Sequence, residues 1–468
     1  MGAPRFMFFS TLAPATAALA LLAACALADA PSAQAAPGGW PPAWNEPPAQ
    51  AQDFTQPQFE PPSASHCHRA PSTREVPGGG GGWNEGRLRR GGVADDRAEM
   101  AAKSIAPSAA PAPMQSAPAP RHEVVTAGMV DDNADFGEYL AYRQRNAGLP
   151  VRERDIAERY LLEVTDAAGR PVHDAVVAVQ RAGRAEPVMW ARTDTAGRVW
   201  LHPRAFLAPG VDDAALGIAV RKGSAWSRAT LVRGERAAVQ VRLGQASVVQ
   251  RPRLDLVFLI DATGSMGDEI AKLKASMQAM SQQISRLPGQ PDICYGLVAY
   301  RDRGDAFLTR AHDFTDELVA FQGALARVQA GGGGDMPEAL NEALHETVHR
   351  MSWRSDAARL VVLVADAPPH LDYGGPQYDV AMQAALAKGI KLFAVGASGL
   401  DPVGEYIYRQ IAQYTAGRFV FLTYKDASDP GSGPGTQTPH DVRGYSVQTL
   451  DRLIVKLVGD ELARLPRG

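Results

Sequence analysis

The sequence LDLVFLIDATGSM at residues 254–266 decides the fold of the carboxyl-terminal half of the chain. Six of the seven residues in 254–260 are apolar, which predicts a strand buried on both faces. The apolar run ends at Asp261, and a short turn then leads into an amphipathic helix. In a parallel α/β sheet, ligands bind in the loop beyond a strand's carboxyl end. We therefore expect a ligand site directly after residue 260.

This loop carries oxygen donors at alternate positions, namely Asp261, Thr263 and Ser265. One carboxylate and two hydroxyls suit a hard divalent cation such as Mg²⁺, or else Mn²⁺ or Ca²⁺. The spacing D-x-T-x-S resembles the metal-ion-dependent adhesion site of von Willebrand factor type A (vWA) domains. A short Asp/Thr/Ser loop is also common in turns and helix caps. The interpretation therefore depends on two segments further along the chain.

The first segment is GGGGDMPE at residues 331–338. A glycine run lets the backbone come close to an ion, and Pro337 suits the first turn of a helix. Where vWA domains usually present a Thr, this chain has Asp335. The second segment, VVLVADAPP at 361–369, is another buried strand that ends in a carboxylate, Asp366. The resemblance implies that the metal ligands are Asp261, Thr263, Ser265, Asp335 and Asp366.

Asp335 brings a third carboxylate to the site. Three carboxylates neutralise more of a divalent ion's charge than a site with Thr at this position. We expect such a site to hold metal well but to attract a partner's acidic side chain less strongly. Asp302 and Asp305, in the loop after the next strand, are candidates for the recognition rim.

From about residue 251 the pattern alternates between strands and helices, which is typical of an α/β sheet. The vWA resemblance covers 251–468 and implies a doubly wound, mostly parallel six-stranded sheet with one antiparallel edge strand. The three loops would then meet at the same edge of the sheet. The expected strands are 254–260, 293–300, 307–314, 360–365, 391–395 and 419–422. The expected helices are 269–287, 317–328, 337–351, 379–388, 403–414 and 447–465.

A smaller all-β region precedes the α/β region. About seven short strands separated by turns in 155–250 predict a β-sandwich. Its turns, VTDAAGRPV and TDTAGRV, resemble those of transthyretin-like modules that accompany carboxypeptidases, which implies a spacer or presenting domain. Residues 131–153 predict a short helical segment. Residues 25–130 are rich in Pro, Gly and Ala, which predicts a long disordered tether.

The amino terminus predicts export. Arg5 precedes a mostly apolar run, so residues 1–24 are typical of a signal peptide. Residues 22–25, LAAC, resemble a bacterial lipobox, in which Cys25 would be acylated. Ala26 beside that Cys, in place of an Asp, resembles known outer-membrane lipoproteins, which implies an outer-membrane location facing the periplasm or the surface. The alternatives are cleavage after the AQA of 33–35, which gives a secreted or periplasmic protein, and an uncleaved membrane anchor.

Cysteine usage and net charge bear on disulfide bonding and on nucleic-acid binding. Apart from Cys25, the chain has Cys67 in the tether and Cys294 in an expected core strand. We expect no disulfide between them, since a buried free Cys behaves as a small hydrophobe. The formal net charge is −3 with no basic stripe, which argues against nucleic acid as a partner.

One motif points to a different function. Residues 345–349 read HETVH and match the zinc-protease pattern H-E-x-x-H. The helical period places His345 and His349 on the flank and the opposite side from the apolar stripe, where they would face solvent. No third ligand follows at the metzincin spacing. A zinc hydrolase that uses His345, Glu346 and His349 is therefore an alternative function.

The leading interpretation is an exported, lipid-anchored bacterial protein that is not an enzyme. Its vWA domain would bind a protein or glycan partner through a divalent metal ion. Besides the zinc hydrolase, the other alternative is a structural envelope protein whose metal site stays empty.

Overall fold

The computed structural model describes residues 67–68, 71–79, 124–184, 186–207, 210–211, 213–244, 251–334 and 336–466. The predicted signal peptide, Cys25 and Asp335 lie outside these residues, so their roles stay predictions. Within the described residues, no helix combines the length and the apolar character needed to span a membrane.

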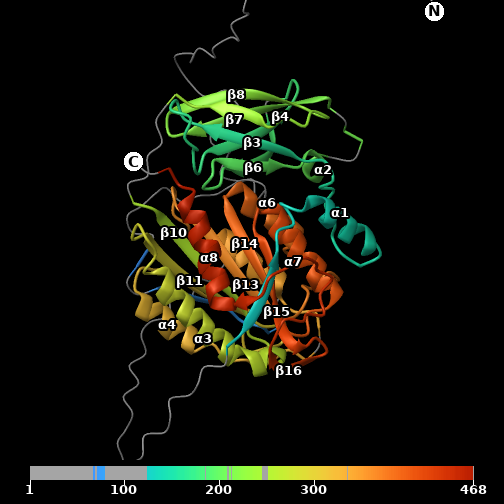
Figure 1. The fold of residues 1–468 in the computed structure, drawn as a ribbon, viewed down its shortest axis with the longest axis vertical. Helices are drawn as coiled ribbons and strands as arrows, with labels where there is room; N and C mark the ends of the chain where they lie inside the picture. Colours follow the sequence, from blue (N-terminus) through green and yellow to red (C-terminus); the bar gives the residue numbers. More distant parts are fainter. Residues whose placement is uncertain are drawn as a thin grey trace, which may run out of the picture. The chain divides into compact units, whose positions relative to one another are not determined.

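A ten-stranded sheet forms the centre of the carboxyl-terminal region (Figure 1). Its middle consists of five parallel strands in the order β11-β10-β13-β14-β15. These strands are β10 (Arg253–Asp261), β11 (Asp292–Tyr300), β13 (Ala358–Ala365), β14 (Ile390–Gly396) and β15 (Arg418–Asp426). Beyond β11 lies β12 (Thr309–Thr315), which is antiparallel to it.

The sheet has ten strands and not the expected six. Two of the additional strands, β16 (Asp429–Pro434) and β17 (Gln448–Thr449), come from the carboxyl-terminal region. The other two, β1 (Thr73–Val76) and β2 (Thr126–Val130), lie in the segment that we predicted to be a disordered tether. That prediction is wrong at these two places. Strands of four and five residues give almost no periodic signal, and the edges of a sheet supply their hydrogen bonds.

Helices cover both faces of this sheet (Figure 1). One face packs against α3 (Gly267–Ile284), α4 (Leu318–Ala326) and α8 (Leu450–Ala463). The other packs against α5 (Leu340–His345), α6 (Tyr378–Ala387) and α7 (Pro402–Tyr414). A five-residue π-helix, Glu346–Arg350, continues α5.

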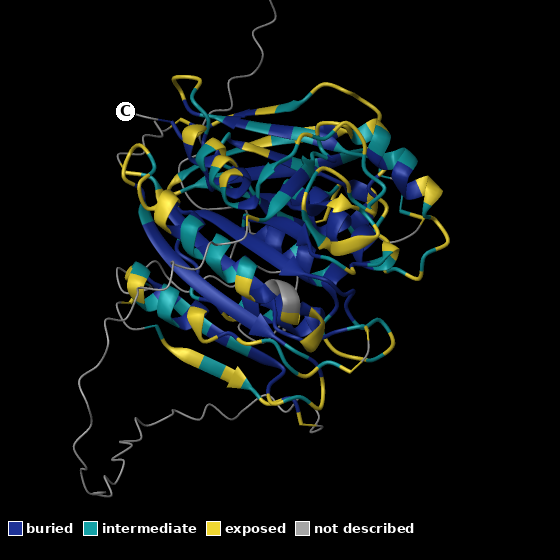
Figure 2. Cartoon of the chain, turned by 60° about the horizontal axis from the view of Figure 1, so that its bottom comes forward, coloured by how far each residue is buried: buried dark blue, intermediate teal, exposed yellow. Residues whose placement is uncertain are grey.

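Strand β10 shows why its apolar run has no polar alternation. Leu256 and Phe258 belong to the core on one face, while Val257 and Leu259 belong to the core on the other. All four side chains are fully buried, and Figure 2 shows the same burial for the central strands. The carboxyl ends of these strands are therefore fixed by packing on both sides.

The β-rich region forms two sheets with the strand orders β6-β3-β9 and β5-β4-β7-β8. Their inward side chains, such as Leu162, Val177 and Ile218, share one core. Before the first of these strands lies α1 (Phe136–Arg145), and α2 (Pro203–Phe206) follows β6. The seven strands are β3 (Tyr160–Thr165), β4 (Val176–Arg181), β5 (Pro187–Arg192), β6 (Arg198–Leu201), β7 (Ala215–Lys222), β8 (Ala225–Val232) and β9 (Val239–Arg242).

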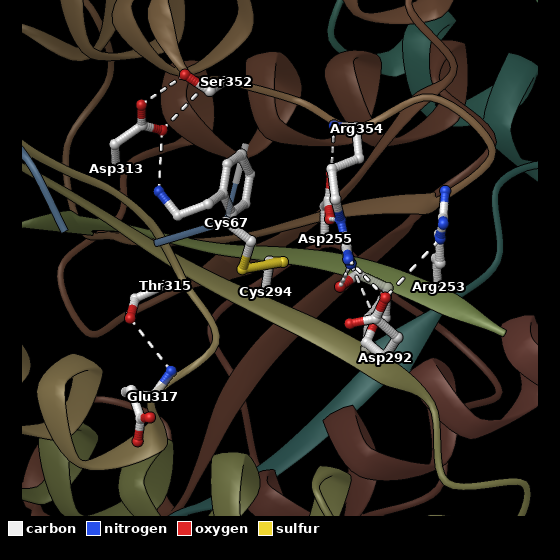
Figure 3. Close-up of a disulfide and its surroundings, with 12 residues drawn as sticks. Cys67, Arg253, Asp255, Asp292, Cys294, Asp313, Thr315, Glu317, Ser352 and Arg354 are labelled. Carbon is white, nitrogen blue, oxygen red and sulfur yellow. Dashed lines mark hydrogen bonds and ion pairs between the residues drawn. A yellow bond between two sulfur atoms is a disulfide. The ribbon is translucent and has the colours of Figure 1, made fainter. Parts of the chain in front are cut away.

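Cys67 and Cys294 form a disulfide, so the expectation that they stay apart is wrong (Figure 3). Their Cα atoms lie 5.9 Å apart although 227 positions separate them in the sequence. They meet because the segment after Cys67 follows β12, the neighbour of β11. The backbone N–H of His68 already donates to the carbonyl of Phe314 over 3.1 Å. No local pattern in the sequence encodes this long-range pairing.

Candidate functional site at the carboxyl edge of the sheet

The loop after β10 is ordered by its own side chains. Asp261 is fully buried, and its Oδ1 accepts hydrogen bonds from the backbone N–H of Thr263 (2.9 Å) and from the Thr263 hydroxyl (2.7 Å). The hydroxyl of Thr263 lies 3.1 Å from that of Ser265. Ser265 itself is exposed. The structure thus brings the three residues of the D-x-T-x-S motif together, from a buried carboxylate to a hydroxyl that solvent can reach.

The glycine run lies directly against this loop. The N–H of Gly331 donates to the carbonyl of Ala262 over 3.1 Å, and the N–H of Gly264 donates to the carbonyl of Gly332 over 2.9 Å. Gly332 and Gly333 have φ angles of 74° and 60°, in the left-handed region that favours glycine. A Cβ on Gly333 would lie 2.9 Å from the Thr263 Cβ. The loop therefore needs glycine both for its conformation and for its close approach.

Two further carboxylates complete the group. Asp366, at the end of β13, is 4% exposed, and its charge acts on Asp261. Glu338 is 2% exposed, and a Cβ added to Gly333 would lie 2.6 Å from its Oε1. The Glu338 N–H donates to Pro368 O over 3.0 Å, which ties Glu338 to the loop that follows Asp366.

Glu338 is the site residue that the sequence interpretation missed. It was visible as the last residue of the GGGGDMPE segment, directly after Pro337. A Glu at the start of a helix is ordinarily explained as a favourable charge near the helix dipole. Only the pairing of its backbone with the loop after β13 places it among the other carboxylates.

The crowding of these carboxylates changes their proton affinity. Burial, and next the charge of Asp366, raise the pKa of Asp261 to about 7. Burial, followed by the charges of Asp261, Asp302, Asp305 and Asp366, raises the pKa of Glu338 to about 9. Without a cation, at least one of these groups therefore keeps its proton at neutral pH.

The donor chemistry fits a hard cation. Among the described residues, the buried oxygens Asp261 Oδ2 and Glu338 Oε2 have no hydrogen-bond partner. Carboxylate and hydroxyl oxygens are the ligands that Mg²⁺ and Ca²⁺ prefer. Among the His, Cys, Asp and Glu side chains of the described residues, however, no three or more lie close enough together to hold a metal ion. Hydroxyl ligands fall outside that set, and Asp335 lies outside the described residues.

The two candidate rim residues face inward. Asp302 is 8% exposed, and its Oδ1 lies 2.9 Å from Nε2 of His370. Asp305 is half-buried, and its Oδ2 accepts from the N–H groups of Asp302 (3.0 Å) and Gly333 (2.9 Å). Arg303 of the same loop is exposed, and its Cζ lies 3.2 Å from the ring centroid of Tyr373. Asp305 thus holds the glycine run in place through its hydrogen bond with Gly333.

The HETVH segment lies at the end of α5 and in the π-helix that follows it. Its two histidines are half-buried, which corrects the expectation that they face solvent. Burial lowers the pKa of His349 to about 3. Glu346 is 5% exposed and forms an ion pair with Arg74 of β1. A carboxylate held by a guanidinium is poorly suited to act as a general base.

Comparison with known proteins identifies the α/β region. The von Willebrand factor type A domain family matches residues 255–428. These residues form a vWA domain.

Curated proteins match part of this chain. The alpha-protein kinase vwkA of Dictyostelium discoideum is 31% identical over 119 residues, which cover 25% of this chain and 19% of that protein. The von Willebrand factor A domain-containing protein 7 of Rattus norvegicus is 36% identical over 95 residues, which cover 20% of this chain and 10% of that protein. The chain thus spans about a fifth or less of the length of these relatives.

Solved structures resemble this chain over part of its length. The open form of the pilus adhesin SpaC from Lactobacillus rhamnosus GG has a TM-score of 0.28 and 13% identity, over 43% of this chain and 29% of that one. Proximal thread matrix protein 1 of the mussel byssus has a TM-score of 0.26 and 16% identity, over 37% of this chain and 48% of that one.

Proposed function

We propose that this is an exported binding protein whose vWA domain holds a divalent cation and captures a protein or glycan partner through it. The observation that supports this most is the convergence of Asp261, Thr263 and Ser265 with Asp366 and Glu338 at one edge of the sheet. Asp335 belongs to the same loop as the glycine run, and we keep it in the proposed ligand set. The protein is not an enzyme in this proposal.

The charge of the site bears on the partner. A divalent ion among Asp261, Asp366, Glu338 and Asp335 has its charge more than balanced when all four are ionised. Such an ion attracts a further carboxylate weakly, so we propose that neutral oxygen atoms of the partner complete the coordination. Sugar hydroxyls and peptide carbonyls both supply such oxygens.

The decisive measurement is the thermal unfolding of the chain from residue 26 onward, with Mg²⁺, Mn²⁺, Ca²⁺ or EDTA. The chain must include the segments before residue 251, because β1 and β2 belong to the sheet. We expect each bound cation to raise the Tm, since it binds only the folded state and relieves the repulsion among carboxylates. Asp261→Ala should remain folded and lose this response. Equal Tm values for the wild type in all four conditions would contradict the metal site.

Attachment to the membrane is a separate part of the proposal. It depends on Cys25 within LAAC, which resembles a lipobox. Cys25→Ser should abolish membrane association and leave a soluble or unprocessed protein. Retention of that variant in the membrane fraction after a high-salt wash would contradict the lipid anchor, whatever the metal measurements give.

A further inference from the structure

A segment from the amino-terminal part of the chain runs along the sheet edge and reaches the candidate site. We call residues 67–79 the strap; its residues 69 and 70 are not described. At one end Cys67 is bonded to Cys294 of β11. In the middle, β1 pairs antiparallel with β12 over four residues. At the other end, the carbonyl of Gly78 accepts a hydrogen bond of 2.6 Å from the N–H of Gly304.

The end of the strap at the site is closely packed. Gly78 is buried, and a Cβ added to it would lie 2.3 Å from the carbonyl oxygen of Asp305. The side chain of Asp305 in turn receives the N–H of Gly333, and the neighbouring Gly332 accepts from Gly264. A movement of Gly78 would therefore pass through Asp305 to the glycine run and the D-x-T-x-S loop.

The middle of the strap is held by weak contacts. Arg310 pairs with Glu75 over 2.7 Å, but both side chains are more than a third exposed. Thr73 and His312 share one exposed hydrogen bond of 2.9 Å. The ion pair of Arg74 with Glu346 is the better shielded contact. Exposed pairs of this kind add little, so a four-residue edge strand can be peeled away from one end.

The disulfide end is attached far more firmly. Cys294 is fully buried in β11, which pairs with β10 over nine residues. Opposite Cys294 in that register lies Asp255, which holds Arg354 over 2.6 Å. Arg354 also donates to the carbonyls of Leu254 and Asp292, so it joins β10 to β11 beside the disulfide (Figure 3).

We propose that the Cys67–Cys294 disulfide carries mechanical load directly into β11, so that tension applied to residues 1–66 does not reach the site. We call this role a mechanical bypass of the strap. With the disulfide intact, tension enters β11 through the sulfur–sulfur bond, and the strap carries none of it. Without the disulfide, the same tension enters at His68 and removes β1 from β12 one pair after another, until it pulls Gly78 from Gly304. The bypass would matter most for a protein anchored near its amino terminus. It follows from the connectivity alone and needs neither the anchor nor the metal.

Single-molecule pulling tests the proposal on the chain from residue 26 to 468, with handles at its two ends. We expect oxidised wild type to show no extension step at low force before the vWA sheet unfolds. Cys67→Ser should show an early reversible step, to which residues 67–79 contribute at most about 4.5 nm, because these residues extend at ~3.5 Å each. Wild type reduced by a small dithiol, which converts the disulfide to two thiols and is itself oxidised to a disulfide, should show the same step. This second route serves if the variant does not fold.

Arg74→Ala is the matched control, because it weakens the strap and leaves the disulfide intact. It should show no early step, whereas Arg74→Ala combined with Cys67→Ser should release the strap at a lower force than Cys67→Ser alone. An early step in oxidised wild type would contradict the bypass. So would the absence of an early step in both the variant and the reduced protein. Neither outcome depends on divalent metal, so EDTA in the buffer leaves the test valid.

Discussion

At the scale of single residues, the carboxylates at the edge of the sheet control the chemistry of the candidate site. Asp261 and Glu338 are both buried, and the charge of Asp261 adds to the burial that raises the pKa of Glu338. A cation that displaces such protons gains new ligands and removes repulsion at once. The role of Glu338 can therefore be separated from that of Asp261 by a neutral substitution of similar shape.

Glu338→Gln should leave the apo protein almost unchanged at pH 7 and weaken its response to Mg²⁺. With a pKa raised to about 9, Glu338 is already uncharged at pH 7 without metal, and Gln imitates that form. Gln cannot supply an anionic ligand once the ion binds. Thermal unfolding with EDTA and with increasing Mg²⁺ measures both effects. A full Mg²⁺ response in the variant would remove Glu338 from the site.

A second residue-scale prediction concerns the contact between the β-rich region and the vWA domain. The carboxylate of Asp174 accepts from Arg359 over 2.9 Å and from Arg192 over 2.9 Å, and all three side chains are largely buried. Asp174→Asn should lower the free energy of unfolding by about 3–5 kcal/mol, because it leaves buried guanidinium groups without their counter-charge. Urea unfolding measures this loss. Asp213→Asn is the control, since its pair with Arg181 lies at the surface, and we expect no measurable change there.

At the scale of elements, the boundaries of the vWA domain in the sequence do not coincide with those of its sheet. β2 supplies hydrogen bonds to β15 along five residue pairs, and β1 does so for β12 along four. Both strands come from before the β-rich region. The sheet is therefore completed by segments that a domain boundary at residue 251 would remove.

Chain truncations test this dependence. The fragment 124–468 keeps β2 and loses the disulfide, so its free energy of unfolding should be lower than that of 26–468 by about 2–5 kcal/mol. The fragment 251–468 also loses β2, leaves an edge of β15 unpaired and loses the ion pair of Arg359 with Asp174. We expect it to aggregate or unfold at lower urea than 124–468. Equal urea midpoints for the two fragments would show that β2 contributes nothing to stability.

At the scale of the whole molecule, the raised pKa values predict how stability depends on pH. The pKa values of Asp261 and Glu338 are about 7 and about 9 in the folded protein, against ~4 in an unfolded chain. An acid with a higher pKa in the folded state keeps its proton there while the unfolded chain has lost it. These groups therefore do not lower the free energy of unfolding below pH ~4. As pH rises, they lower the free energy of unfolding by an increasing amount. This loss reaches its full size above pH about 7 for Asp261 and above pH about 9 for Glu338.

In EDTA these two groups should accordingly contribute a decline in Tm as pH rises from ~4 to ~9, while His349, half-buried and neutral, contributes the opposite effect up to pH ~6.5. Saturating Mg²⁺ should reduce the decline relative to EDTA. Glu338→Gln provides the control, because the part of the decline between pH ~7 and ~9 should be smaller in that variant. Parallel pH profiles for the wild type in EDTA and in Mg²⁺ would contradict the link between these protons and the cation.

Features that depend on neighbouring residues were predictable from the amino-acid sequence. The nearly continuous apolar run before Asp261 predicted a strand buried on both faces, and the glycine run at 331–334 predicted a close backbone approach. Both depend on local pattern and on steric limits that a few adjacent residues express. The D-x-T-x-S spacing likewise placed Thr263 and Ser265 beside Asp261, because alternate residues of one turn necessarily lie together.

Features that join distant segments became visible only in the folded chain. Cys67 meets Cys294 because β1 pairs with the edge of the sheet, and that pairing leaves no pattern in a four-residue strand. Glu338 joins the site because its backbone bonds to the loop after β13, which no spacing along the chain reveals. Both depend on hydrogen bonds between segments that are remote in sequence, whose free energy exists only once the sheet has formed.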